Sequence, residues 1–182
     1  ALTGPGQNDR LFPWLAEHAD LQAMRWFIAQ EAAGEAGFDD LVALTQIKLP
    51  AQAKLELARN YWDEMGHGNA RGMHGPMLEA LVRALDLDPQ PHTTVWQSLA
   101  LGNLMTALAM NREFAFHSVG ALGVIEMTAP DRSQAVARGL ARLVVDKSSR
   151  HSVDLLPVLD RKHAEQWDGA ATMPRADRNP PQ

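Results

Sequence analysis

Apolar residues recur along this chain at intervals of three and four positions, and they almost nowhere alternate residue by residue. Intervals of three and four place apolar side chains on one face of an α-helix, whereas alternation is typical of a half-buried β-strand. Between positions 21 and 36, for example, this spacing gathers on one face Leu21, Met24, Phe27, Ile28 and Ala32. The sequence therefore predicts an all-α fold, a bundle of about seven helices.

Proline, glycine and capping residues mark where these helices are expected to begin and end. Pro130 lacks a backbone N–H, so it is expected to end one helix before Asp131 caps the next. Thr93 or Thr94 is expected to cap an earlier helix. Both ends of the chain are rich in Gly, Pro and Asn and are expected to be flexible tails. Residues 1–182 would then form one helical domain with a core over about 21–168.

The composition argues against several classes of partner. The chain has no cysteine, so a metal would be held by His, Asp and Glu, a ligand set that favours iron or manganese. A formal net charge of −5 argues against nucleic acid or an anionic membrane, and the basic stretch 132–150 is interpreted as the solvated side of a helix. No apolar run approaches the roughly 20 residues of a membrane span, and no signal peptide is visible. We expect a cytoplasmic protein with a small-molecule substrate, either monomeric or a homodimer.

Two candidate metal ligands lie three residues apart near the C-terminus. Asp160 and His163 share one helical face with the apolar residues Leu159 and Trp167. A carboxylate and an imidazole that face a core need a partner, because burying them unpaired is unfavourable by several kcal/mol. A metal ion is one such partner, and the alternative is an ion pair at the surface.

Two further candidates are single glutamates among apolar residues. Glu126 lies in the apolar turn 123–127, and Glu31 shares a helical face with Phe27 and Ile28. Each is either a buried ligand or a surface residue. One turn after Glu31, Glu35 is the alternative ligand on the same helix.

The richest stretch in potential ligands contains two acids and two histidines among aromatic and methionine residues. Glu64 and His67 form a Glu-x-x-His pair, the spacing of ferritin-like dimetal proteins. Glu64 and His74 are ten residues apart, about 15 Å along a straight helix, so they can meet only across a break. Helical periodicity alone favours His67, whereas His74 requires a non-helical or bulged backbone between Gly66 and Gly72.

Four motifs follow one another between about residues 21 and 167. They are Gln30-Glu31 with FDDLVAL at 38–44, NYWDEMGHG at 60–68 ending in His74, GALGVIE at 120–126, and LDRKHAEQW at 159–167. In this order they resemble the motifs of iron-containing redox enzymes of the haem-oxygenase-like diiron oxidase family. The resemblance implies a haem-oxygenase-like helical bundle with two non-haem iron ions. It also implies dioxygen-dependent oxidation of a small organic substrate such as an amino acid or a fatty acid.

When the family's ligands are carried over by position, the resemblance also implies a ligand set for this chain. That set contains His74 and not His67. The implied iron ligands are Glu31, Glu64, His74, Glu126, Asp160 and His163. One family position differs, because relatives have a histidine four residues before the aspartate and this chain has Leu156. A leucine cannot coordinate iron, so we expect one well-occupied iron and a second that is weakly held or absent.

The departure at Leu156 keeps a second function open, a non-catalytic helical interaction protein with a partly lost metal site. Retention of the six other ligands argues against that alternative. A true haem oxygenase is disfavoured, because acidic residues that face inward would repel the propionates of haem.

Overall fold

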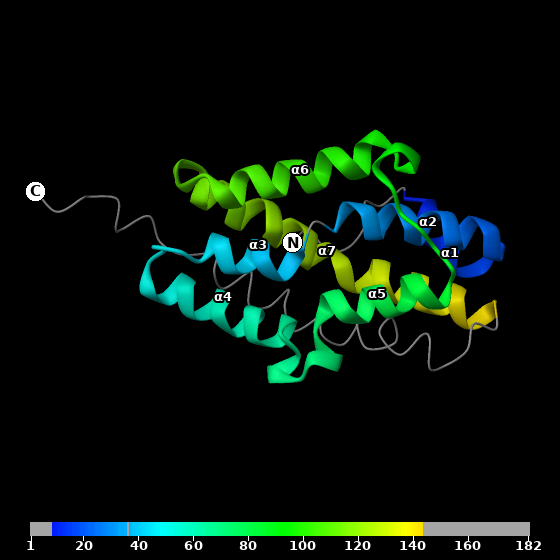
Figure 1. Ribbon diagram of the computed structural model, residues 1–182, viewed down its shortest axis with the longest axis horizontal. Helices are drawn as coiled ribbons and strands as arrows, with labels where there is room; N and C mark the ends of the chain where they lie inside the picture. Colours follow the sequence, from blue (N-terminus) through cyan, green and yellow to red (C-terminus); the bar gives the residue numbers. More distant parts are fainter. Residues whose placement is uncertain (1–8, 36, 144–182) are drawn as a thin grey trace, which may run out of the picture.

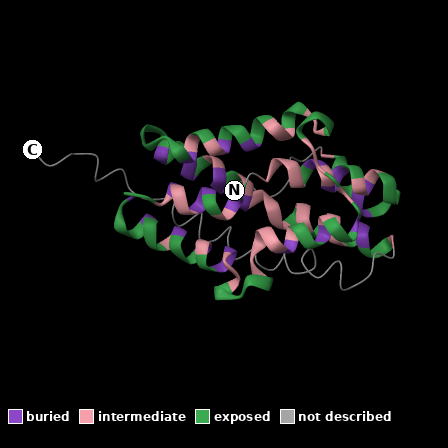
Figure 2. Ribbon diagram, in the orientation of Figure 1, coloured by how far each residue is buried: buried purple, intermediate pink, exposed green. Residues whose placement is uncertain are grey.

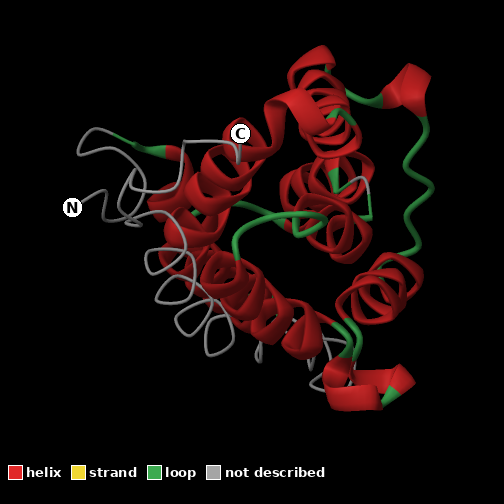
Figure 3. Cartoon of the chain, turned by 90° about the vertical axis from the view of Figure 1, so that its left-hand side faces the viewer, coloured by secondary structure: helices red, strands yellow, loops and turns green. Residues whose placement is uncertain are grey.

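The computed structural model describes residues 9–35 and 37–143 (Figure 1). Its α-helices are α1 (Leu11–Glu17), α2 (Leu21–Gly34), α3 (Phe38–Thr45), α4 (Ala51–Glu64), α5 (His74–Ala84), α6 (Trp96–Met110) and α7 (Ala115–Arg142). Short 3₁₀ turns lie in the connections, at Gly66–Gly68, Ala70–Gly72, Pro91–Thr93 and Arg112–Phe114. The described ranges contain no β-strand (Figure 3), so the prediction of an all-α fold is confirmed.

The longest helix, α7, runs through the bundle and packs against α1, α3 and α6 (Figure 1). Its contact with α1 is especially close at Gly139. A Cβ atom at this position would clash with the carbonyl oxygen of Leu15, so only glycine lets the two backbones approach this far. In this way α1 adds the fully buried Leu15 to the core, although it precedes the expected start of that core at about residue 21.

Buried apolar residues form two clusters along the bundle. Figure 2 shows the buried positions along the helices. One cluster joins α3, α4, α6 and the N-terminal half of α7, and includes Val42, Leu57 and Leu122. The other joins α1, α2, α5 and the C-terminal part of α7, and includes Leu15 and Leu140. Because burial of apolar surface is the main favourable term in folding, each cluster stabilises its own part of the bundle. The region between the clusters holds the candidate site.

The expected helix boundary at Pro130 is wrong, because α7 continues through this residue. Proline inside a helix removes an N–H and crowds the preceding turn, which is unfavourable by about 3 kcal/mol or more. Here the side chain of Arg132 donates hydrogen bonds to the carbonyls of Ile125 and Thr128, at 3.3 and 3.1 Å. These bonds give two carbonyls of the turn before the proline a side-chain donor.

The expected threonine cap of α6 is also wrong. Val95 precedes the helix, and its N–H donates a hydrogen bond of 2.8 Å to the side-chain oxygen of Gln30 in α2. The Thr94 hydroxyl instead donates to the carbonyl of Gln90. None of the described helices is long and apolar enough to cross a membrane.

Candidate metal centre

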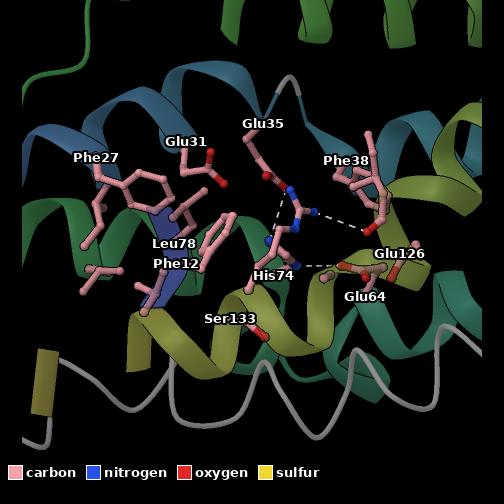
Figure 4. Close-up of a pocket in the computed structure, with 16 residues that line it drawn as sticks. Phe12, Phe27, Glu31, Glu35, Phe38, Glu64, His74, Leu78, Glu126 and Ser133 are labelled. Carbon is pink, nitrogen blue, oxygen red and sulfur yellow. Dashed lines mark hydrogen bonds and ion pairs between the residues drawn. The ribbon is translucent and has the colours of Figure 1, made fainter. Parts of the chain in front are cut away.

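A cavity of about 190 Å³ lies between the two apolar clusters (Figure 4). Together with Arg132, four carboxylates and an imidazole line it. They are Glu31 near the end of α2, Glu35 directly after α2, Glu64 at the end of α4, His74 at the start of α5 and Glu126 in the middle of α7. The cavity therefore collects carboxylates and an imidazole from four helices.

His74 joins two of these carboxylates. Its Nδ1 lies 3.0 Å from Oε2 of Glu64, and its Nε2 lies 3.1 Å from Oε1 of Glu35 (Figure 4). Burial alone would lower the pKa of His74, but the hydrogen bonds and negative charges of Glu35 and Glu64 outweigh burial and raise it well above 6.5. The two carboxylates therefore favour the protonated imidazole in the metal-free site, and it would lose a proton on binding a metal.

The connection between α4 and α5 brings Glu64 and His74 together. After α4 ends at Glu64, the backbone takes positive φ angles of 58° at Gly66 and 55° at His67. A Cβ atom on Gly66 would overlap the backbone of Gly72, so the two glycines let this short loop close on itself. The predicted departure from a regular α-helix between Gly66 and Gly72 is confirmed.

His67 lies outside the cavity. Its side chain is 59% exposed, and its Nε2 lies 2.6 Å from Oδ1 of the buried Asp63. Its ring stacks on Trp62 at a centroid distance of 6.2 Å. Of the two histidines weighed from the sequence, the structure places His74 in the cavity and turns His67 toward the surface.

Glu126 is buried in the middle of α7, close to an asparagine from α4. Asn60 is fully buried one helical turn before Glu64, and its Nδ2 lies 3.5 Å from Oε1 of Glu126. The Oδ1 atom of Asn60 accepts no hydrogen bond from the described residues. Buried polar atoms normally have partners, so this atom fits a site that takes up a further polar group. The sequence analysis did not single out Asn60, although its spacing from Glu64 places both on one face of α4.

Glu31 and Arg132 bring opposite charges to the cavity. Glu31 reaches solvent at the edge of the cavity, yet the protein atoms packed around it exclude part of its water and raise its pKa; the positive charge of Arg132 opposes this shift, and the negative charge of Glu35 adds to it. The guanidinium of Arg132 lies 6.0 Å from the ring of Phe12. For Arg132, the expectation of a solvated position is wrong, because the residue is half-buried and lines the cavity. It turns inward because α7 continues through Pro130.

The rest of the lining is mainly apolar. It consists of Phe12, Phe27, Ile28, Phe38, Leu78, Leu81, Ile125, Ala129 and Val136, with Ser133 as an added polar residue. The rings of Phe12 and Phe27 meet edge to face at 5.8 Å. Phe12 comes from α1, which the sequence analysis did not assign to the site. An apolar lining next to the ionisable groups keeps water away and strengthens their electrostatic interactions.

Four of the six predicted iron ligands line this cavity, namely Glu31, Glu64, His74 and Glu126. Asp160 and His163 lie outside the described residues, as does Leu156. Within residues 9–35 and 37–143, no three His, Asp or Glu side chains are grouped closely enough to hold an ion.

The chemistry of the described donors nevertheless fits iron, because carboxylate oxygen and imidazole nitrogen are suitable ligands for it. The 3.0 Å between Glu64 Oε2 and His74 Nδ1 is the distance of an ion pair, and a metal ion bound by both groups would take the place of the proton between them.

Comparison with known proteins supports the resemblance seen in the sequence. The chain matches the family model described as iron-containing redox enzyme over residues 25–182. This span includes all four motifs and all six predicted ligands. None of the curated proteins compared with the chain matches it. The family match, together with the helices of the described residues, confirms the predicted haem-oxygenase-like helical fold. The chain belongs to the haem-oxygenase-like family of iron-containing redox enzymes.

Proposed function

We propose that this protein is a non-haem iron oxidase or oxygenase that uses dioxygen to oxidise a small organic substrate, such as an amino acid or a fatty acid. Two iron ions would share six ligands, with one ion held more weakly than the other. The ligands are Glu31, Glu64, His74, Glu126, Asp160 and His163. The substrate would be a free small molecule, with no part played by nucleic acid or membrane.

One observation carries this proposal: α2, α4, α5 and α7 each present a carboxylate or an imidazole to one cavity. Glu64 and Glu126 are buried there, and burying carboxylates is unfavourable unless cations compensate their charge. Among the described residues, His74 and Arg132 supply only part of that compensation. A metal ion with two or three positive charges would supply the remainder.

Bound iron would supply the redox chemistry that a reaction with dioxygen requires. The residues of the chain would bind and orient the substrate. The apolar lining around Phe12 and Phe27 would hold an apolar part of the substrate and exclude water. The positive charge of Arg132 would orient a negatively charged group in the same cavity. A volume of about 190 Å³ would limit the substrate to a small molecule.

Dioxygen uptake after anaerobic loading with Fe(II) tests this proposal. We expect the iron-loaded protein to consume dioxygen, and the metal-free protein and a His74→Ala variant to consume none. Glu79→Gln is a suitable control, because Glu79 lies on the same helix as His74 with an exposed side chain. Iron that is bound but consumes no more dioxygen than free Fe(II) would argue against an oxidase.

Leu156 favours a second candidate function, a non-catalytic helical interaction protein that retains the fold. In that case the family histidine was lost together with the need for metal. This alternative predicts that neither the unmodified protein nor a Leu156→His variant binds iron. Iron binding by the unmodified protein would contradict it.

A further inference from the structure

Of the four described carboxylates that line the cavity, Glu35 is the one that the family-implied ligand set does not include. It follows the last residue of α2, and its side chain is 27% exposed. Together with Leu78, it also lines a shallow groove beside α5, so it forms part of the wall between that groove and the cavity. Glu35 therefore lies at the solvent side of the site.

The two ring nitrogens of His74 face different surroundings. Nδ1 faces Glu64, whose side chain is only 3% exposed, and Glu126 lies on the same side of the ring (Figure 4). Nε2 faces Glu35, on the solvent side. Both N···O distances suit a hydrogen bond, so burial is what distinguishes the two nitrogens.

An imidazole that binds a metal through one nitrogen carries a proton on the other. This N–H is almost always hydrogen-bonded to a carboxylate, a backbone carbonyl or water, and the bond fixes both the tautomer and the ring orientation. Glu35 is placed to accept such a bond from Nε2 of His74. The buried Nδ1 then remains for the metal, next to Glu64.

We infer that Glu35 is a positioning residue that accepts the Nε2–H bond of His74 and thereby presents Nδ1 to iron beside Glu64. The inference rests on the proposed function, because it requires iron in the cavity. Glu35 also makes the ring a stronger donor, since a negatively charged acceptor raises the basicity of the imidazole. A stronger donor at His74 is more important in this chain, because Leu156 stands where the family ligand set has a third imidazole.

Anaerobic competition between the protein and a chelator for Fe(II) tests the inference. We expect Glu35→Ala to weaken iron binding by about 10- to 100-fold, the range typical of partners that orient a ligand. The number of irons bound at saturation should stay unchanged, because Glu35 does not itself bind iron. Glu35→Gln should have a smaller effect, since its amide oxygen still accepts the bond. Glu79→Gln removes an exposed charge from the neighbouring helix α5 and should leave the affinity unchanged.

Proton NMR of the Fe(II)-loaded protein gives a readout that a general loss of stability would not change. A proton on Nε2 of an iron-bound imidazole has a strongly shifted resonance that exchanges with water. We expect this resonance to be visible in the unmodified protein and in Glu35→Gln, because in both the side chain at position 35 accepts the Nε2–H bond and slows exchange with water. In Glu35→Ala, faster exchange with solvent should broaden it or remove it.

The possible outcomes separate this inference from the proposed function. If the unmodified protein binds iron and Glu35→Ala binds it within twofold as tightly, the role of Glu35 is wrong and the proposed function stands. If Glu35→Ala loses an iron even at saturation, Glu35 is a direct ligand and the positioning role is wrong. If the unmodified protein binds no iron, the proposed function is wrong, and the inference is wrong with it.

Discussion

His74 carries a positive charge between two glutamates in the metal-free site, so its protonation links stability to pH. Its pKa is raised in the folded state above its value of about 6.5 in an unfolded chain. A group of this kind stabilises the fold fully below pH 6.5, and the contribution disappears as the pH rises through the folded pKa. We therefore expect the free energy of unfolding of the metal-free protein to fall above neutral pH.

Urea denaturation in the presence of a chelator, between about pH 6 and pH 9, measures this dependence. A His74→Gln variant is the control, since glutamine cannot take up a proton. The unmodified protein should lose more stability across this range than the variant. Parallel pH profiles for the two proteins would show that His74 does not hold the expected charge.

Leu156 stands where the family ligand set has an imidazole, four residues before Asp160. Leu156→His should raise the amount of iron bound per chain, because it restores a ligand. The gain in affinity should exceed the 10- to 100-fold effect typical of residues that only orient a ligand. Leu155→His adds the same side chain one position away from the family ligand position and should give no gain. Two tightly bound irons in the unmodified protein, with no gain in Leu156→His, would show that Leu156 is harmless.

Individual site residues differed in how well the sequence predicted them. The motifs placed Glu64, His74 and Glu126 in one cavity, because each motif surrounds its ionisable residue with apolar neighbours. Asn60 and Arg132 were missed, since their contacts at the site come from distant parts of the chain. Asn60 lies 66 residues from Glu126 in the sequence, and the spacing of residues along one helix cannot predict a contact between side chains of two distant helices.

At the level of elements, the loop between α4 and α5 determines whether Glu64 and His74 meet. Gly66 has a φ of 58°, and a Cβ atom there would overlap the backbone of Gly72. Gly66→Ala should therefore destabilise the fold by more than about 1 kcal/mol. It should also weaken iron binding, because the loop would have to open.

Gly120→Ala is the matched control for this substitution. Gly120 lies inside α7 with no atom within 4 Å of an added Cβ, so alanine should stabilise the helix by up to about 1 kcal/mol. Urea denaturation and iron titration of both variants measure the two effects. Normal stability and iron affinity in Gly66→Ala would contradict the role of this loop.

Pro130 lies one turn after Glu126 and disturbs α7 at the site. Pro130→Ala should stabilise the metal-free protein by about 1 kcal/mol or more, because a good helix former replaces a breaker. The straighter turn should move Glu126 and Arg132, so iron binding should weaken. Denaturation of the metal-free variant and titration with Fe(II) test the two halves of this prediction. An increase in both stability and iron affinity would show that the proline has no part in placing the site.

Helix boundaries were predictable where local residues set them and unpredictable where distant residues did. The starts of α3 and α4 follow from Gly37 and Pro50. By contrast, the N–H of Val95 before α6 is bound by Gln30, which is 65 residues away. The passage of α7 through Pro130 likewise goes against helix-breaking rules, which do not take the packing of α7 against α1, α3 and α6 into account.

At the scale of the whole molecule, two apolar clusters flank a cavity that contains several acids. Periodicity predicted the helices, because each one buries a single face. The division of the core into two clusters was not predictable, because it depends on which helices pack together. The ionisable residues of the cavity belong to neither cluster, so substitutions at them should change iron binding more than the packing of either cluster.

The proposed function requires iron to bind between α2, α4, α5 and α7. Anomalous X-ray diffraction at the iron absorption edge, from crystals grown with Fe(II) under anaerobic conditions, tests it most directly. We predict an iron peak within bonding distance of Nδ1 of His74, next to Glu64 and Glu126. A peak elsewhere, for instance between the buried Asp63 and the exposed His67, would rule out this site. So would the absence of any iron peak in this cavity.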